Sequence, residues 1–382
     1  MGNFWPSNCG NNNNSQVEQP KLFGKLPAPY LIKDIDPVLF IFTNNSVNEP
    51  RVTINSTYLP NDAVDLLLTN SCLDNCERFV VLTHGFRSSH ASGWLGDMKN
   101  AIIQWDTKRT QTIAILGWGK GADLSMLKYG QAASNSIETG RWLGNFLAAL
   151  RERCPKIEIY GIGHSLGAHL MGSAGRTSKS IDRITGLDPA GVGFQEDNID
   201  KRLNSLDAQL VDVIHTDGQD VPYFGTLVPL GVVDFYPNYG WNQPTNDGQR
   251  SMKPDLDTDD KHHKIVRPSP YGGNISESHS RAVDYFIWSI SNRHSFRTHL
   301  RLDGIPDVES AVHRVVTTGK DGTPNITLEM GYYCDRNIET QIQQQETNGQ
   351  TCNIRPRSDV YTKYDQFAGC FYVHTNGHEP WC

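Results

Sequence analysis

Short apolar runs that alternate with helix-period segments constrain the fold of this chain more than any other feature. The runs carry Val, Ile, Leu and Phe with few polar interruptions, as expected of strands that are buried on both faces. They lie at 38–43, 79–83, 112–116, 157–162, 184–187 and 210–215. Residues 125–153 and 279–291 place apolar side chains on one helix face. The pattern therefore predicts an α/β fold, with a mostly parallel central sheet and helices on both faces.

Composition and charge exclude several classes of function. The 382 residues carry a formal net charge of −7, without the basic excess that nucleic-acid binding requires. No apolar run approaches the length of about 20 residues that a transmembrane helix requires. We therefore expect no nucleic-acid partner, and we expect any contact with lipid to be peripheral.

Cysteines and glycosylation sequons indicate the compartment. Eight cysteines form an even set without zinc-ligand spacing, and five Asn-x-Ser/Thr sequons accompany them. Both features favour a secreted, disulfide-bonded glycoprotein. Sequential pairing of Cys334 with Cys352 and of Cys370 with Cys382 is the simplest arrangement. Residues 1–6 lack the basic and apolar regions of a signal peptide, so either the signal has been removed or the inference of secretion is wrong.

Two segments interrupt the alternating pattern. Residues 1–25 are rich in Asn and poor in apolar groups, so we expect a flexible leader. Residues 245–277 are crowded with Asp, Lys, His, Pro and Gly, a composition that is typical of a long loop. This loop is long enough to cover a site at the edge of the sheet.

The sharpest local motif is Gly163-His164-Ser165-Leu166-Gly167. It lies directly after one of the expected strands and directly before a helix-compatible run. In this setting small residues allow a sharp turn, so that the Ser165 hydroxyl projects from the carboxyl edge of the sheet at the start of a helix. The spacing alone arises by chance in about one chain in five of this length, and a Gly-rich crossover turn is the alternative interpretation.

A carboxylate at the end of the next strand is the candidate acid. A serine hydroxyl is a poor nucleophile unless a neighbouring base, itself oriented by a carboxylate, takes its proton. Asp188 ends the strand that follows Ser165, which places both residues at the same edge of a parallel sheet. We therefore predict Asp188 as the acid, with Asp212 and Asp217 as alternatives.

The candidate base is one of 13 histidines. His279 is preferred because it follows Ser165 and Asp188 in the chain order of α/β-hydrolases and opens a helix after the last long loop. His215 is the main competitor, and a structural role for His279 at the helix start is the other interpretation. His164 lies inside the sharp turn and is expected to point away from Ser165.

Two backbone N–H groups are needed to hold the oxyanion that forms during acyl transfer. Leu166 directly follows the candidate nucleophile and is expected to supply one of them. Phe86 lies in the loop after the expected strand at 79–83, and we predict its N–H as the second donor.

Together these motifs resemble those of the pancreatic-type lipase family, which includes triacylglycerol lipases, sn-1 phospholipases, lipoprotein lipase-like proteins and yolk proteins. The matching segments are 81–86, 161–169, 186–190, 213–218, 234–238, 278–282 and 371–376. The resemblance covers residues 30–382, about the whole chain after the leader, and implies an α/β-hydrolase fold. It also gives the segment 213–218, with its histidine and aspartate, a structural role.

The resemblance implies a role for each candidate residue. It makes Ser165, Asp188 and His279 the catalytic triad. It makes Phe86 and Leu166 the donors of the oxyanion hole. These are the residues that the strand pattern and the chain order indicate independently.

The chain departs from the family pattern at the lid and at the calcium site. The cysteines that bracket the lid in the family are missing, so the loop 245–277 resembles an unstapled, polar lid. Arg202 and Asp207 match the family's calcium-binding stretch, but acidic ligands are usual where this chain has Ile199 and Asn204. The reaction itself requires no cofactor, and calcium is a weak candidate.

Two further departures concern the core and the C-terminal end. Gly117-Trp118 stands where the family has Asp-Trp. The segment 371–376 closes the catalytic domain in the family, and six residues follow it here. We therefore expect a single α/β-hydrolase domain over 26–382, without a C-terminal β-sandwich.

The predicted function is a secreted serine esterase that hydrolyses carboxylic esters of lipids through an acyl-enzyme. We favour a triacylglycerol lipase because the lid-like segment is long, with an sn-1 phospholipase as the alternative. A non-catalytic lipid-binding or yolk-like protein is the alternative from another class, and an intact triad argues against it. The expected partner is a lipid at an aggregate or membrane surface.

Overall fold

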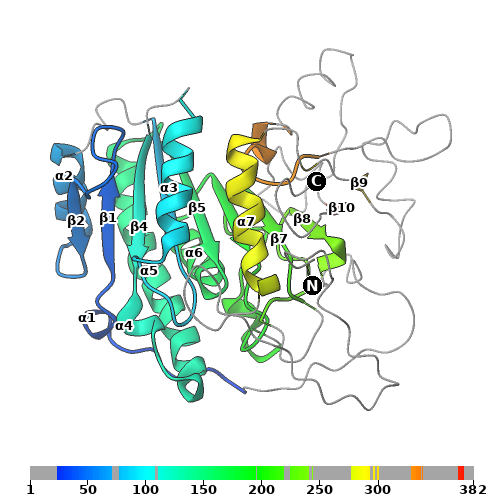
Figure 1. Ribbon diagram of the computed structural model, residues 1–382. Coiled ribbons are helices and arrows are strands. Elements are labelled where there is room, and N and C mark those ends of the chain that lie inside the picture. The colour runs from blue at the N-terminus through cyan, green and yellow to red at the C-terminus, as the bar shows by residue number, and fades with distance from the viewer. Residues whose placement is uncertain are drawn as a thin grey trace, which may run out of the picture.

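The computed structural model describes residues 24–70, 77–107, 111–194, 196–218, 224–240, 243, 277–292, 296, 299–300, 328–336, 338 and 369–373. The described strands form one ten-stranded sheet in the order β2-β1-β4-β3-β5-β6-β7-β8-β10-β9 (Figure 1). Every neighbouring pair from β4 to β10 is parallel. Strand β1 runs antiparallel to β2 and β4, and β9 runs antiparallel to β10. The predicted, mostly parallel sheet is confirmed.

The strands coincide closely with the apolar runs of the sequence. Their bounds are β1 Val38–Phe42, β2 Val52–Asn55, β3 Arg78–Thr83, β4 Gln111–Gly117, β5 Glu158–His164, β6 Arg183–Leu187, β7 Leu210–Ile214, β8 Val233–Pro237, β9 His299–Leu300 and β10 Gly369–Val373. The six predicted strands are confirmed to within two residues at each end. Strands β2, β8, β9 and β10 extend the sheet beyond that prediction.

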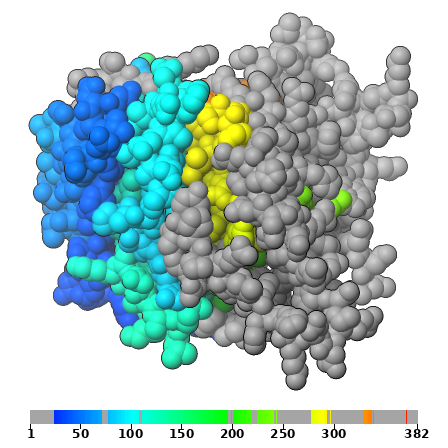
Figure 2. Space-filling model, in the orientation of Figure 1, coloured from blue at the N-terminus to red at the C-terminus, as the bar shows by residue number. Residues whose placement is uncertain are grey.

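Helices cover both faces of the sheet (Figure 1). Their bounds are α1 Ile32–Ile35, α2 Pro60–Asn70, α3 Gly93–Trp105, α4 Gly119–Ala122, α5 Tyr129–Arg153, α6 Leu166–Ser178 and α7 Glu277–Ser291. Short 3₁₀ turns are η2 Met126–Lys128, η3 Glu196–Lys201 and η4 Asn238–Gly240. The helix predicted from residue 125 therefore begins at Tyr129, after η2. Figure 2 shows α3 and α7 side by side on the face toward the viewer, and the two helices are in contact.

Burial on both faces explains why the strands are apolar throughout. Phe79 and Val81 of β3 pack into the core cluster that includes the buried side chains of α5 and α6. Val80 and Leu82, which alternate with them, pack into the cluster of α3 and α7. Successive side chains of a strand point to opposite faces, so a sheet with helices on both sides requires apolar residues at every position.

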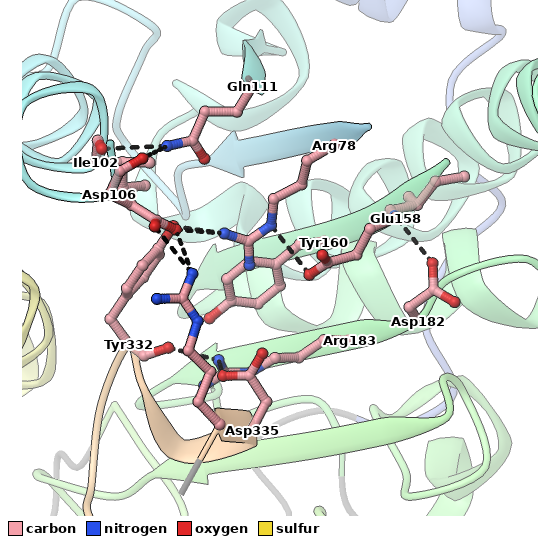
Figure 3. Close-up of polar contacts among 12 residues, drawn as sticks. Arg78, Ile102, Asp106, Gln111, Glu158, Tyr160, Asp182, Arg183, Tyr332 and Asp335 are labelled. Carbon is pink, nitrogen blue, oxygen red and sulfur yellow. Dashed lines mark hydrogen bonds and ion pairs between the residues drawn. The ribbon is translucent and has the colours of Figure 1, made fainter. Parts of the chain in front are cut away.

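A buried ion network occupies the amino edge of the sheet, where the parallel strands begin (Figure 3). Arg183, the first residue of β6, binds both oxygens of Asp212 at 2.7 and 3.0 Å, and its Nη1 lies 2.9 Å from Asp335. Arg78, the first residue of β3, pairs with Asp106 at 3.1 Å and with Glu158 at 3.0 Å. The network links the starts of the strands to residues 328–336, far along the chain.

Several sequence predictions fall outside the described residues. The predicted leader, apart from residues 24 and 25, and residues 245–276 of the lid-like loop are among them. Residue 277, the last of that predicted loop, is the first residue of α7. Among the described helices, none combines the length and the apolar composition that crossing a membrane would require.

Candidate active site

Ser165 lies on a strained turn between β5 and α6. Its φ of 58° and ψ of −121° are unusual for a residue with a side chain, and such strain is typical of functional sites. The flanking glycines are sterically required: a Cβ on Gly163 would lie 2.2 Å from the Gly167 carbonyl oxygen. A Cβ on Gly167 would lie 2.7 Å from the carbonyl oxygen of His84. The predicted strand–turn–helix setting of the motif is confirmed.

Asp188 and His279 are brought together from separate parts of the chain. Asp188 follows β6 with a φ of 42°, and His279 lies in the first turn of α7. The Nδ1–H of His279 donates to Asp188 Oδ2 at 2.5 Å, and both side chains are buried. This bond fixes the tautomer that leaves Nε2 of His279 free of a proton, as a general base requires.

The Asp188 carboxylate is oriented by its surroundings. Its Oδ1 accepts the backbone N–H of Thr216 at 2.7 Å and that of Asp217 at 3.2 Å. Gly225 lies directly against it, because a Cβ there would sit 2.5 Å from both carboxylate oxygens. Only a residue without a side chain allows the backbone to approach so closely. Sequence reasoning missed this constraint, because nothing in the sequence places Gly225 beside Asp188.

Burial sets the protonation of this pair. It raises the pKa of the Asp188 carboxyl to about 7, against the opposing effect of the two backbone donors. It lowers the pKa of His279 to about 3, because desolvation disfavours the imidazolium. The two groups are in hydrogen-bond contact, so they titrate as a pair. At a pH between these two pKa values the pair shares one titratable proton, and it loses that proton near the higher pKa.

The backbone of residues 84–86 lies against the Ser165 side chain. A Cβ on Gly85 would lie 2.7 Å from the Cβ of Ser165 and 3.1 Å from its Oγ. Phe86 is buried with its ring edge-on to Tyr129 at 5.1 Å. Leu166, the first residue of α6, follows Ser165 directly. The two predicted oxyanion donors thus lie on the segments that flank the Ser165 hydroxyl.

His84 and Trp118 hold this loop in place, which sequence reasoning missed. The backbone N–H of Trp118 donates to His84 Nε2 at 3.2 Å, and the indole N–H donates to the His84 carbonyl at 3.0 Å. The Nδ1–H of His84 in turn donates to the Gly85 carbonyl at 3.0 Å. Burial lowers the pKa of His84 to about 4, so the ring stays neutral and keeps this pattern at neutral pH.

The position of Gly117 has a steric explanation. A Cβ there would lie 2.9 Å from the Cβ of His90, whose ring stacks on Phe40 at 4.2 Å. The aspartate expected at this position from the family pattern would occupy the space that His90 fills. The departure at Gly117 is thus coupled to the His90 side chain.

The competing candidates take other places. His215 faces the Thr226 carbonyl at 2.6 Å with Nδ1 and Asp234 at 2.8 Å with Nε2, so its nitrogens are engaged away from Ser165. Asp212 belongs to the ion network at the opposite edge. Asp217 stays close, because one of its carboxylate oxygens lies within 4.8 Å of ligand atoms of both Asp188 and His279.

Comparison with known proteins identifies the family. A family model described as Lipase matches residues 25–300. The chain belongs to the lipase family. A lipase-family relative described as inactive pancreatic lipase-related protein 1, from Canis lupus familiaris, is 30% identical over 81% of this chain and 61% of its own length. Pancreatic triacylglycerol lipase from Myocastor coypus is 34% identical over 56% of this chain and 46% of its own length. The chain thus spans about half to three fifths of these curated relatives.

Among solved structures, the dienelactone hydrolase from Anabaena variabilis matches 39% of the chain and 66% of its own length, with 14% identity and a TM-score of 0.26. The order and direction of the strands and the setting of Ser165 themselves fit an α/β-hydrolase fold.

The residues of the candidate calcium site do not fit a bound metal in this lipase-family chain. The Asp207 carboxylate accepts from Arg176 at 2.6 Å and from the backbone and side chain of Asn204 at 2.9 and 3.1 Å. Both of its oxygens are therefore engaged, and the guanidinium already balances its charge. Arg202 adds a second cation nearby, and its carbonyl accepts from Arg176 at 3.0 Å. We therefore assign Asp207 a structural role.

The predicted disulfide between Cys334 and Cys352 involves a residue outside the described part of the chain, so it stays a prediction. Cys334 itself is buried, and within the described residues it has no disulfide partner. Burial raises the pKa of this thiol well above its ordinary value, which makes it unreactive. Cys370 lies in β10, and its pairing with Cys382, which is outside the described residues, stays a prediction. Cys154, directly after α5, is disulfide-bonded.

Proposed function

We propose that this chain is a serine esterase that hydrolyses carboxylic esters of lipids, and that triacylglycerol is its substrate. The observation that carries the proposal is the buried His279–Asp188 hydrogen bond of 2.5 Å at the edge where the strained Ser165 follows β5. Membership of the lipase family supports a hydrolase with a lipid substrate. One named relative is called inactive, so turnover by this chain itself is the point to test.

The proposed reaction begins with attack by the Ser165 Oγ on the acyl carbonyl carbon. His279 Nε2 takes the hydroxyl proton, and Asp188 stabilises the imidazolium through Nδ1. The backbone N–H groups of Phe86 and Leu166 stabilise the oxyanion of the tetrahedral intermediate. When the intermediate collapses, the C–O bond to the alcohol breaks and His279 gives its proton to the leaving oxygen. This leaves the acyl group on Ser165.

The second half of the reaction releases the fatty acid. Water attacks the acyl-enzyme while His279 Nε2 takes a proton from it, and the same two N–H groups stabilise the second oxyanion. Collapse then breaks the ester to Ser165, and His279 returns the proton to its Oγ. No metal or organic cofactor takes part in these steps.

The charge of the chain supports a neutral or zwitterionic substrate. A net charge of −7 gives little attraction to anionic membranes, since such attraction depends on clusters of Lys and Arg. We propose that the enzyme acts at the surface of a lipid aggregate or membrane. The sequons and the even number of cysteines support secretion.

Purified protein assayed on a triacylglycerol emulsion and on phosphatidylcholine vesicles tests the proposal. We expect release of fatty acid from the emulsion by the wild-type chain and none by Ser165→Ala. Activity on phosphatidylcholine but not on triacylglycerol would contradict the proposed triacylglycerol lipase and favour the alternative function, an sn-1 phospholipase. A folded wild-type chain that is inert on both lipids would favour the non-catalytic, lipid-binding alternative.

A further inference from the structure

His164, the residue before the nucleophile, contacts the candidate base. It is the last residue of β5 and is only 5% exposed. Its Nε2 lies 2.9 Å from the backbone carbonyl oxygen of His279, and the two imidazole rings have centroids 4.6 Å apart. The sequence predicts only that His164 points away from Ser165. It does not predict that the His164 side chain contacts His279, the candidate base for Ser165.

The hydrogen bond to His279 defines the tautomer of His164. A carbonyl oxygen can only accept, so Nε2 of His164 must carry the proton that it donates. Burial lowers the pKa of His164 to about 3, with a further contribution from the neighbouring His279. The ring is therefore neutral at pH 7, and no second imidazolium competes with the one that forms on His279 during catalysis.

The His164 ring also contacts an aromatic side chain of α3, and its backbone is paired within the sheet. The indole of Trp94, from α3, meets it edge-on with centroids 6.0 Å apart. The backbone of His164 pairs with Leu187 of β6, and the next N–H, that of Ser165, donates to the Leu187 carbonyl at 3.0 Å. Asp188 follows Leu187 directly. The paired ends of β5 and β6 therefore carry the nucleophile Ser165, the acid Asp188, and His164, which contacts the base.

We infer that His164 is a positioning residue for the base: its Nε2–H fixes the first turn of α7, and with it the His279 ring, relative to Ser165. The inference rests on the proposed function, because it concerns the geometry of that reaction. His279 lies in the first turn of α7, and its backbone carbonyl there is tied to the end of β5 through His164. The Asp188 bond orients the His279 ring, and the His164 bond holds the backbone that carries it.

Substitutions that separate the donor from the ring test this role. His164→Phe keeps a planar ring and removes the N–H, whereas His164→Gln places an amide N–H as many bonds from Cβ as Nε2. A displacement of about 1 Å costs about 100-fold in rate. We therefore expect His164→Phe to lower kcat for a soluble short-chain p-nitrophenyl ester by about 10- to 100-fold, with KM changed by less than about twofold. His164→Gln should recover most of that loss.

A matched control lies at the other end of the same helix. Tyr333 donates its hydroxyl proton to the Ile290 carbonyl of α7 at 3.1 Å, far along the helix from His279. Tyr333→Phe also removes a buried donor to an α7 carbonyl while keeping a ring. We expect it to lose stability without loss of kcat. If His164→Phe fails to fold, His164→Leu, which introduces a smaller side chain, replaces it in the comparison with His164→Gln.

The outcomes separate the inference from the proposed function. An active wild-type chain with a kcat defect in His164→Phe, recovered in His164→Gln, supports the inference. An active wild-type chain whose kcat is unchanged in His164→Phe, or equally reduced in Tyr333→Phe, overturns the inference and leaves the proposed function intact. A folded wild-type chain without esterase activity overturns both.

Discussion

The two edges of the sheet bury polar groups in opposite ways. At the amino edge, Arg78 and Arg183 lie on either side of the Tyr160 ring, at 5.1 and 4.6 Å from its centroid, and carboxylates meet both guanidinium groups (Figure 3). At the carboxyl edge, Asp188 is paired with His279, and burial raises the pKa of the acid and lowers the pKa of the base, so the neutral form of each group is favoured. The amino edge thus buries paired opposite charges, whereas the carboxyl edge buries a pair whose neutral forms are favoured.

Positive φ values gather at the carboxyl edge, although one also occurs at Lys179, which caps α6 before the start of β6. Ser165 and Asp188, which follow β5 and β6, have positive φ values of 58° and 42°, and Asn238, which follows β8, has a φ of 49°. Such conformations cost stability and persist where the surroundings impose them. The comparison teaches that burial of polar groups alone does not mark a functional site. A functional site is marked by backbone strain together with a buried acid–base pair that lacks full charge compensation. Ser165 with the Asp188–His279 pair shows this combination at the carboxyl edge.

The largest expected effect is on the acid at the carboxyl edge. Asp188→Asn removes the carboxylate that orients and stabilises His279, and we expect kcat for a soluble ester to fall by about 10⁴-fold. Asp217→Asn is the comparison, since Asp217 lies close to the same pair, and its loss should stay below about 10-fold. Steady-state kinetics on both variants checks this. A larger loss in Asp217→Asn would move the role of acid to Asp217.

The corresponding change at the amino edge should affect stability and spare the chemistry. Arg183→Leu leaves the buried Asp212 and the partly buried Asp335 without their cation, which we expect to lower the free energy of unfolding by about 3–5 kcal/mol. Arg141→Leu, which breaks an exposed pair with Glu138, should cost less than about 1 kcal/mol. Urea unfolding followed by tryptophan fluorescence measures both. Equal losses would show that the amino-edge network contributes no more than a surface pair.

Gly225 offers a finer test of the carboxyl edge. A methyl group at this position would lie 2.5 Å from both oxygens of Asp188, so Gly225→Ala must displace the carboxylate. We expect kcat to fall by about 100-fold. Gly96→Ala is the control, because a Cβ there meets nothing within 4 Å, and it should leave kcat unchanged. Unchanged activity in Gly225→Ala would mean that the position of Asp188 is not critical.

The mildest perturbation is a change of pH on the wild-type chain. The active form has Asp188 ionised and His279 neutral, so the pair must lose the proton that it holds below a pKa of about 7. We expect kcat/KM to rise about tenfold per pH unit up to about pH 7 and to level off above it. Circular dichroism at each pH separates this titration from unfolding. A profile that is flat down to pH 5 would contradict the shared-proton account.

The carboxyl edge was the more predictable of the two. Apolar runs identify strands that are buried on both faces. Ser165 and Asp188 directly follow two of these strands, and His279 comes at the start of a helix after them in the chain. The amino-edge network could not be predicted from the sequence. An arginine at the first position of a strand, such as Arg78 or Arg183, looks the same in the sequence whether it is buried or exposed to solvent. Their partners in 328–336 lie far away in the sequence. Contacts such as that between Gly225 and Asp188 depend on distances that no local pattern encodes.

Covalent labelling of Ser165 tests the central claim most directly. The account predicts that wild-type protein treated with an organophosphonate gains the mass of one phosphonyl group, on Ser165, because His279 and Asp188 activate that hydroxyl. Ser165→Ala should gain none, and prior unfolding in urea should abolish labelling of the wild-type chain. Intact-mass spectrometry with peptide mapping reads out all three samples. A folded wild-type chain that gains no adduct, or an adduct that persists in Ser165→Ala, would contradict the account.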